Sequence, residues 1–149
     1  MTVNRAVVVG AGMTGLLAAR VLSDLVDSVL VIDRDDLADS PEARRGVPQG
    51  RHVHGLLASG ERVLRGAFPG LVEELVAGGA VRVGASDLRW WQYGGYRVPG
   101  AWPAVTFCSR PFLELGVRRR VSSLPRVDIT RGLARGLSDR VGKVLTGCI

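Results

Sequence analysis

Hydrophobic positions near the start of the chain fall into three blocks whose periods predict a strand, a helix and a second strand. Residues 6–9 form an unbroken run, Ala-Val-Val-Val, that ends at a glycine, as expected for a strand buried on both faces of a parallel sheet. Residues 13–25 have the period of a helix with one buried side. The apolar stripe predicted for this helix consists of Leu17, Val21 and Leu25. Residues 28–32 form the second apolar run, so the segment predicts a β-α-β unit.

The rest of the chain alternates between turn-rich and periodic segments. Residues 35–49 are polar and contain prolines and glycines, which predicts a loop. Helical spacing predicts further helices over residues 52–67, 69–76 and 111–121. A two-residue turn at Gly94-Gly95 predicts a hairpin that joins residues 88–93 to residues 96–98. The last apolar runs predict a strand meander over residues 127–130, 133–137 and 141–149.

A glycine motif lies between the first predicted strand and helix. It reads Gly10-Ala11-Gly12-Met13-Thr14-Gly15, a G-x-G-x-x-G. In such motifs the first glycine permits a tight turn, the second lets a pyrophosphate approach the backbone, and the third lets helix and strand pack closely. Asp33, 18 residues after Gly15, stands where an acid accepts hydrogen bonds from an adenosine ribose. The unit predicts a dinucleotide site that suits FAD or NAD; the alternative is a glycine-rich turn without a ligand.

These elements together predict an α/β fold. We expect residues 1–149 to form one Rossmann-like domain, a parallel sheet with flanking helices, a hairpin insertion and a terminal strand meander. The final run stops in strand-like sequence without a polar tail. We therefore expect the domain to be an incomplete amino-terminal part of a larger protein.

Charge and cysteine content narrow the classes of partner. The formal charge is +6, and of the 20 basic residues every one except Lys143 is an arginine. The arginines are scattered, with the densest cluster at residues 118–120, and no basic stripe is interleaved with aromatic residues. We therefore expect no nucleic-acid partner. Two distant cysteines, Cys108 and Cys148, fit reduced thiols in the cytoplasm.

Neither a membrane span nor a metal site is predicted. No apolar run approaches the ~20 residues of a spanning helix, and glycines interrupt the apolar start that superficially resembles a signal peptide. His52 and His54 have no accompanying cluster of acids or cysteines, and on a helix residues two apart do not share a face. The aromatic residues of the hairpin serve either an apolar substrate pocket or hairpin packing. These aromatic residues are Trp90, Trp91 and Tyr93.

A second motif distinguishes FAD from NAD. Residues 44–54 read R-R-G-V-P-Q-G-R-H-V-H, a basic loop that suits a clamp on an anionic cofactor. The pattern R-x-G-V-P-Q-x-x-H-x-H after a G-x-G-x-x-G unit resembles the bacterial FAD-dependent monooxygenases related to aromatic hydroxylases. The most similar members are flavin epoxidases and hydroxylases of polyketide biosynthesis in actinomycetes. Phe68-Pro69-Gly70 with Glu74-Leu75 and Gly79-Ala80, and Ser109-Arg110-Pro111 with Leu115 and Val117-Arg118, also resemble segments of that family.

The resemblance assigns cofactor contacts to individual residues. It implies that Gly10, Gly12 and Gly15 hold the pyrophosphate of FAD, that Asp33 binds the ribose, and that Arg34 lies beside the adenosine. It also implies that Arg44, Gln49 and Arg110 line the flavin side. A surface ion pair is the alternative for Arg44 and Arg110. No catalytic side chain is implied, because in such enzymes the cofactor performs the chemistry.

The implied activity is oxidation of an apolar or aromatic small molecule, hydroxylated or epoxidised with NAD(P)H and oxygen. The family also carries a later Asp-Gly pair and a later Gly-Asp segment, and neither lies in these 149 residues. Two other functions stay open: a truncated, non-catalytic flavin- or nucleotide-binding remnant, and an NAD(P)-dependent dehydrogenase. The loop at residues 44–54 and the absence of a candidate acid–base site in the sequence count against the dehydrogenase.

Overall fold

A three-stranded parallel sheet forms one side of the molecule. The computed structural model describes residues 4–84, 86–87, 89–96 and 103–136. Strand β1 (Arg5–Val9) leads through helix α1 (Met13–Leu22) to strand β2 (Ser28–Asp33), and the two strands are parallel, with Val7 opposite Leu30. Strand β8 (Val127–Arg131) pairs in parallel with the other edge of β2. The predicted β-α-β unit is thus confirmed.

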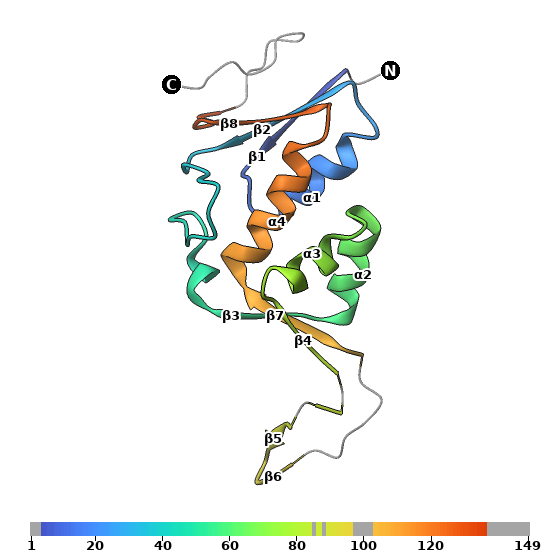
Figure 1. Ribbon diagram of the computed structural model, residues 1–149. Coiled ribbons are helices and arrows are strands. Elements are labelled where there is room, and N and C mark those ends of the chain that lie inside the picture. Colours follow the sequence, from blue (N-terminus) through green and yellow to red (C-terminus); the bar gives the residue numbers. More distant parts are fainter. Residues whose placement is uncertain (1–3, 85, 88, 97–102, 137–149) are drawn as a thin grey trace.

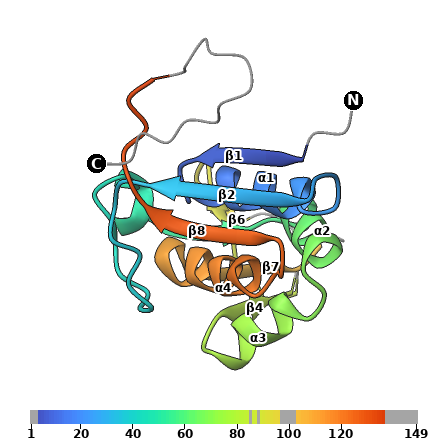
Figure 2. The same ribbon diagram turned by 90° about the horizontal axis from the view of Figure 1, so that it is seen from above.

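Helices cover one face of this sheet, as Figure 2 shows from above. Helix α4 (Arg110–Ser122) packs beside α1, and the shorter helices α2 (Ala58–Ala67) and α3 (Leu71–Ala77) lie farther from the sheet (Figure 1). Their apolar side chains meet those of the sheet in one hydrophobic core. Its fully buried members include Leu16, Val29, Val31, Leu71, Val117 and Val121.

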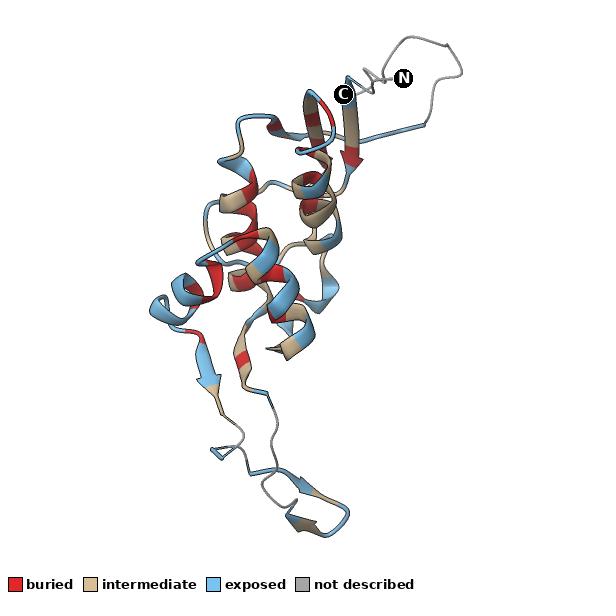
Figure 3. Cartoon of the chain, turned by 90° about the vertical axis from the view of Figure 1, so that its right-hand side faces the viewer, coloured by how far each residue is buried: buried red, intermediate tan, exposed pale blue. Residues whose placement is uncertain are grey.

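A second, antiparallel sheet lies on the far side of the helices (Figure 1). Its order is β3 (Val53–Leu56), β7 (Val105–Ser109) and β4 (Val81–Val83). A short 3-10 helix, η1 (Pro48–Arg51), precedes β3. The hairpin of β5 (Trp91–Gln92) and β6 (Gly95–Tyr96) extends away from this sheet, and Figure 3 shows it exposed while the buried residues gather among the helices.

The predicted stripe on α1 is correct at Leu17, which packs against the core, and wrong at Val21 and Leu25. Val21 and Leu25 are 59% and 69% exposed, whereas Leu16 and Ala19 are fully buried. The helix also ends at Leu22 instead of residue 25. The buried side is fixed by the close approach of α1 to β1, which the spacing of large apolar residues within the helix does not reveal.

The predicted helix over residues 52–67 is correct only in its second half. Residues 53–56 form β3, which pairs with β7 from Val53 opposite Ser109 to Leu56 opposite Thr106. Helix α2 begins at Ala58. The hydrogen bonds of β3 come from a strand some 50 residues later, and such a distant partner overrides the local apolar period.

The hairpin is confirmed, but its turn is one residue earlier than predicted. Trp91 lies opposite Tyr96 and Gln92 opposite Gly95, so the turn residues are Tyr93 and Gly94, with φ of 53° and 81°. Two successive positive φ values are typical of a type I′ turn, which matches the twist of a hairpin. Residues 88, 97 and 98 of the prediction lie outside the described residues.

The predicted terminal meander is also corrected. Residues 127–131 form β8, which joins the parallel sheet, and residues 133–136 form no strand. Residues 137–149, with Cys148 and Lys143, lie outside the described part. The apolar run at 127–130 belongs to β8, which pairs with the edge of β2 that β1 leaves free. The sequence alone does not distinguish such a parallel strand from an antiparallel one.

The arginine cluster on α4 links this helix to other segments, through a buried contact of Arg118 and through solvent-accessible ion pairs of Arg119 and Arg120. Arg118 is 8% exposed and donates a hydrogen bond to the carbonyl of Ala38. Arg119 pairs with Asp39, and Arg120 pairs with Glu74 on α3. Among the described residues, no helix has the length and apolar character needed to cross a membrane.

Candidate nucleotide-binding site

The glycine loop connects β1 to α1 and has the geometry that its spacing predicts. Gly10 has a φ of +99°, and its N–H donates to the carbonyl of Ile32 at 2.7 Å. A Cβ on Gly15 would lie 1.8 Å from the carbonyl oxygen of Gly10, so only glycine allows α1 to pack this closely on the turn. A Cβ on Gly12, in contrast, would meet no heavy atom within 4 Å. The space above Gly12 is therefore open to a ligand.

Helix α1 begins at this open space. Gly12 is its N-cap, and within the described part no side chain caps the helix and no acid stands in its first turn. The first N–H groups of a helix have no partner inside the helix and attract anions. Phosphate oxygens suit this end of α1, and the open surface of Gly12 gives them room.

Asp33 ties the glycine loop to the end of β2. Its side chain is largely buried, Oδ2 accepts a 2.6 Å hydrogen bond from the N–H of Ala11, and Oδ1 accepts one of 2.8 Å from the N–H of Asp35. Burial, the largest single influence, raises the pKa of Asp33. The two amide hydrogen bonds and the charge of Arg44 outweigh it, so the pKa lies below its ordinary value. Asp33 is therefore a carboxylate held ionised beside the loop.

Asp35 connects the same network to the second motif. Its Oδ2 accepts a 2.8 Å hydrogen bond from the N–H of Gly46 and lies 3.3 Å from Nη1 of Arg44. A Cβ on Gly46 would lie 2.7 Å from this oxygen. The R-x-G part of the motif is thus held against the end of β2, which gives these two residues a structural role that the sequence did not reveal.

Arg44 is the centre of the network. Its side chain is only 10% exposed, Nη1 lies 3.4 Å from Oδ2 of Asp33, and Nη2 donates to the carbonyl of Ala11 at 3.2 Å. Nε donates to Oε1 of Glu114 at 2.9 Å. Burial lowers the pKa of Arg44, but Glu114 and Asp33 raise it by more. A surface ion pair was the alternative to a flavin contact for Arg44. The residue does form ion pairs, but they are buried.

Arg110 and Glu114 bring α4 to this site. Ser109 caps the helix, its Oγ accepting a 3.3 Å hydrogen bond from the N–H of Phe112, and Arg110 is the first residue of the helix. Nε of Arg110 lies 3.8 Å from Oε2 of Glu114. Glu114 was not predicted from the sequence, although its i,i+4 spacing from Arg110 on a predicted helix indicates such a pair.

The other predicted contacts lie around this centre. Gln49 is exposed in η1, which packs at the start of α4: a Cβ on the adjacent Gly50 would lie 3.7 Å from Cγ of Pro111. Arg34 is exposed directly after β2. The structure thus brings Arg44 and Arg110 together through Glu114, places η1, which carries Gln49, against α4, and leaves Arg34 on the surface directly after Asp33.

Two cavities flank the segment of residues 35–40. One, of about 210 Å³, lies between this segment and α4, and Arg44 and Glu114 are among its lining residues. The other, of about 540 Å³, lies between the same segment, α4 and β8. Arg118 lines both. The described part of the molecule is therefore hollowed on both sides of the loop that follows β2.

The histidines and the hairpin aromatic residues lie elsewhere. His54 lies in β3 and His52 directly before it, between η1 and the strand, and Nδ1 of His54 lies 2.7 Å from the carbonyl of His52. No group of three or more His, Cys, Asp or Glu side chains suited to a metal ion occurs in the described ranges.

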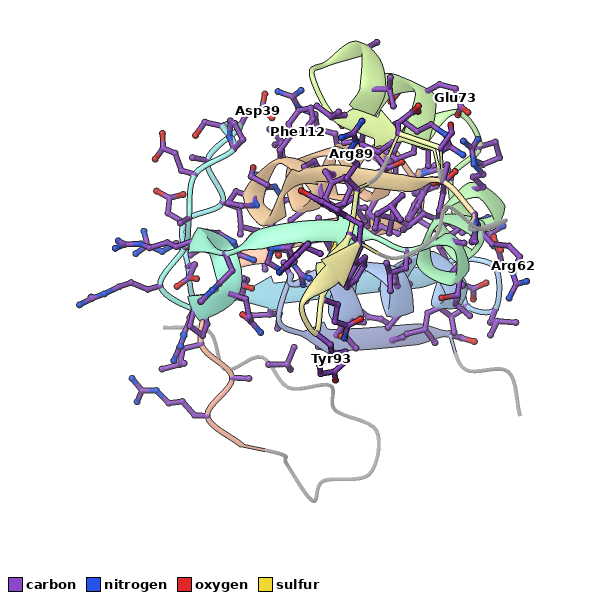
Figure 4. The ribbon with its side chains drawn as sticks, turned by 90° about the horizontal axis from the view of Figure 1, so that it is seen from below. Asp39, Arg62, Glu73, Arg89, Tyr93 and Phe112 are labelled. Atoms are coloured by element: carbon purple, nitrogen blue, oxygen red, sulfur yellow. The ribbon has the colours of Figure 1, made fainter. Side chains whose placement is uncertain are left out.

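The aromatic residues of the hairpin are exposed. Trp90, Trp91 and Tyr93 are 52%, 60% and 98% exposed, and Figure 4 shows Tyr93 at the end of the hairpin. Trp91 makes an edge-to-face contact with Tyr96, with ring centroids 4.9 Å apart. Hairpin packing thus accounts for Trp91 but not for Trp90 or Tyr93.

Comparison with known proteins gives sequence and structural relatives. No protein-family model matches the chain. Protein Rv3254 of Mycobacterium tuberculosis strain H37Rv is 40% identical over 136 residues, which cover 87% of this chain and 29% of that protein. The tetrameric form of 2-methyl-3-hydroxypyridine-5-carboxylic acid oxygenase has a TM-score of 0.57 at 21% identity, and p-nitrophenol 4-monooxygenase from Pseudomonas putida DLL-E4 has 0.57 at 18%.

These likenesses establish the fold. Both oxygenase structures cover 86% of this chain, and the chain covers 31% and 32% of theirs. The mixed α/β fold with a three-stranded parallel sheet is thus shared with part of two oxygenases. The chain spans less than a third of the length of each relative.

Proposed function

We propose that the chain is the FAD-binding part of a flavin-dependent monooxygenase that hydroxylates or epoxidises an apolar or aromatic small molecule. The observation that carries the proposal is the hydrogen-bonded network that joins the glycine loop to Asp33 and to the R-x-G motif. It combines a general dinucleotide motif with the motif by which the sequence resembles FAD-dependent monooxygenases. The fold shared with two oxygenases, whose names state that they act on aromatic compounds, supports the same family.

The residues present fit a flavin nucleotide. The open surface of Gly12 and the uncapped start of α1 suit the pyrophosphate, and the ionised Asp33 suits ribose hydroxyls. Gly10 and Gly15 shape the turn, and Arg34 would lie beside the adenosine. Arg44, Gln49 and Arg110 would line the flavin side.

In this proposal the chain's own residues bind and orient the cofactor, and none of them is assigned as an acid or base for the reaction. Bound flavin supplies redox chemistry, with NAD(P)H as the proposed reductant and oxygen as the oxidant. The glycine loop fixes the position of the phosphates, and Asp33 fixes the ribose. Arg44 holds the loop through its hydrogen bond to the carbonyl of Ala11. A cytoplasmic location is part of the proposal, supported by the free thiol of Cys108.

An NAD(P)-dependent dehydrogenase is the second candidate, because the glycine loop and Asp33 serve NAD as well as FAD. Incubation with FAD, removal of free ligand by desalting, and a visible absorption spectrum separate the two. We expect retained flavin absorbance in the wild-type chain and its loss in Gly12→Val. Asp27→Ala, which changes an exposed carboxylate at the opposite end of β2, is the control and should retain flavin.

Each other outcome contradicts the proposal. A folded, colourless chain that binds NADH indicates the dehydrogenase. A folded chain that binds neither nucleotide indicates the non-catalytic remnant without a cofactor. Circular dichroism of every variant shows whether the loss of flavin reflects the site or the fold.

A further inference from the structure

Glu114 lies between the two arginines that the sequence places on the flavin side. Its side chain is 4% exposed. Oε1 accepts hydrogen bonds from both Nε and Nη2 of Arg44, and Oε2 lies 3.8 Å from Nε of Arg110. Arg44 precedes it by 70 residues, whereas Arg110 stands one helical turn before it on α4. A single buried carboxylate thus faces both guanidinium groups.

The contact with Arg44 fixes the orientation of the guanidinium plane. Nε and Nη2 form one edge of this plane, and both donate to the same oxygen of Glu114. Nη1 then faces Asp33 and Asp35, at 3.4 Å and 3.3 Å. Because an arginine side chain is long and has many rotamers, a second point of contact of this kind decides which way it presents its donors.

The contact with Arg110 is incomplete. Oε2 of Glu114 and Nε of Arg110 are both buried, and neither has a hydrogen-bond partner among the described residues. Buried polar atoms without hydrogen-bond partners reduce stability, and the 3.8 Å ion pair between these two atoms offsets only part of that cost. The two atoms lie at the start of α4, beside the 210 Å³ cavity that Arg44, Pro111 and Glu114 help to line.

We propose that Glu114 is a positioning residue, which fixes Arg44 within the network of the glycine loop and holds Arg110 in the orientation in which its guanidinium group meets a bound flavin nucleotide. The inference rests on the proposed FAD binding. Glu114 acts through the arginines and does not touch the nucleotide itself, because a carboxylate repels phosphate. Its removal should therefore weaken FAD binding only while the arginines are present.

A double-mutant cycle tests this dependence. The dissociation constant for FAD is measured from the quenching of flavin fluorescence by the purified chain and by Glu114→Gln, Arg44→Ala/Arg110→Ala and the triple variant. We expect Glu114→Gln to raise the dissociation constant about tenfold in the wild-type chain and less than about twofold when both arginines are absent. Glu74→Gln, which changes a carboxylate paired with Arg120 on the exposed side of α4, is the matched control.

A second measurement does not depend on FAD. The Nε–H resonance of Arg44, followed by ¹⁵N NMR, should be protected from solvent exchange in the wild-type chain. It should stay protected in Glu114→Gln, whose amide oxygen still accepts from Arg44 while its amide NH2 no longer attracts Arg110, and lose protection in Glu114→Leu. This readout reports the orientation of Arg44 and is insensitive to whether the chain binds flavin.

The outcomes separate the two proposals. Two results would overturn the role of Glu114 and leave the proposed function intact, provided that the wild-type chain binds FAD. In the first, Glu114→Gln binds FAD as tightly as the wild-type chain. In the second, Glu114→Gln raises the dissociation constant by the same factor whether or not the two arginines are present. Protected Arg44 in a chain that binds no FAD overturns the proposed function, and with it any role of Glu114 toward a flavin. An unprotected Arg44 in the wild-type chain overturns the positioning role whatever the affinity for FAD.

Discussion

The N–H of Ala11 donates a 2.6 Å hydrogen bond to Oδ2 of Asp33, and this bond joins the turn after β1 to the end of β2. The other oxygen of Asp33 accepts the N–H of Asp35, whose own carboxylate accepts the N–H of Gly46. Two motifs more than 30 residues apart therefore share one chain of hydrogen bonds. The shape of the glycine loop and the charge of Asp33 depend on each other.

The two glycines of the loop should respond differently to alanine. At Gly12 a Cβ meets no atom within 4 Å and φ is −78°, so Gly12→Ala should lower the free energy of unfolding by no more than about 1 kcal/mol, the cost of alanine at an N-cap. A Cβ on Gly15 would lie 1.8 Å from a carbonyl oxygen, so Gly15→Ala should cost more than about 3 kcal/mol or prevent folding. Urea denaturation followed by circular dichroism measures both. Equal effects at the two positions would contradict the loop geometry.

Asp33 should make stability depend on acidic pH. The unfolded carboxyl has its ordinary pKa of about 3.9, and the folded pKa is lower, so the unfolded chain binds the proton more tightly. The contribution of Asp33 is therefore complete above about pH 4 and is lost as the pH falls through the folded pKa. We expect a smaller loss of unfolding free energy on acidification in Asp33→Asn, measured by urea titrations at several pH values. Asp27→Asn, which removes one exposed carboxylate, controls for net charge; an unchanged dependence in Asp33→Asn would refute the prediction.

Gly46 should tolerate alanine poorly although it lies on an exposed loop. The Cβ would lie 2.7 Å from Oδ2 of Asp35, so the carboxylate must move and its hydrogen bond to the Gly46 N–H weakens. We expect Gly46→Ala to lower the free energy of unfolding by about 1 kcal/mol. Gly66→Ala is the matched control, because a Cβ there meets nothing within 4 Å and α2 gains up to about 1 kcal/mol. Thermal denaturation should show melting temperatures that move in opposite directions.

Glu61 should contribute to stability away from the nucleotide site. It is 5% exposed on α2 and accepts hydrogen bonds from Arg82 on β4 at 2.5 Å and from Thr106 on β7 at 3.2 Å. Glu61→Ala should lower the free energy of unfolding by about 1–3 kcal/mol, toward the smaller value because Arg82 is 40% exposed and regains water.

Glu73 provides the control for Glu61. It is 59% exposed, pairs with Arg65, and appears on the outside of the molecule in Figure 4. Urea denaturation of Glu73→Ala should give nearly wild-type stability. If the two alanine variants were equally stable, the buried network would have no part in joining α2 to the second sheet.

The sequence predicts the parts of the fold that depend on local pattern and short separation. The glycine spacing, the apolar runs on either side and Asp33 define β1, α1 and β2, because each of these signals lies within about 30 residues. The start of α4 follows from Pro111 and the helical period after it. The partner of β3 and the direction of β8 are set by pairings that no local period records.

In the candidate site, too, the sequence predicts what depends on local motifs and not what depends on packing between distant segments. Sequence motifs identify Asp33, Arg44 and Arg110, but not that Arg44 is buried among carboxylates. That arrangement needs Glu114 from a helix 70 residues later, and only the packing of α4 beside the glycine loop brings it there. The hairpin turn was misplaced by one residue because Tyr93 takes a positive φ that glycine usually supplies.

The separation between Arg44 and Glu114 has a consequence for how the protein is made. During synthesis the glycine loop, Asp33 and Arg44 leave the ribosome well before α4 exists, since Glu114 follows Arg44 by 70 residues. Until that helix emerges, the charged groups of Asp33 and Arg44 stay hydrated, and the long loop between Arg44 and Glu114 must close before their pairing is gained. The nascent chain therefore reaches its nucleotide-binding shape late, after most of its secondary structure has been translated.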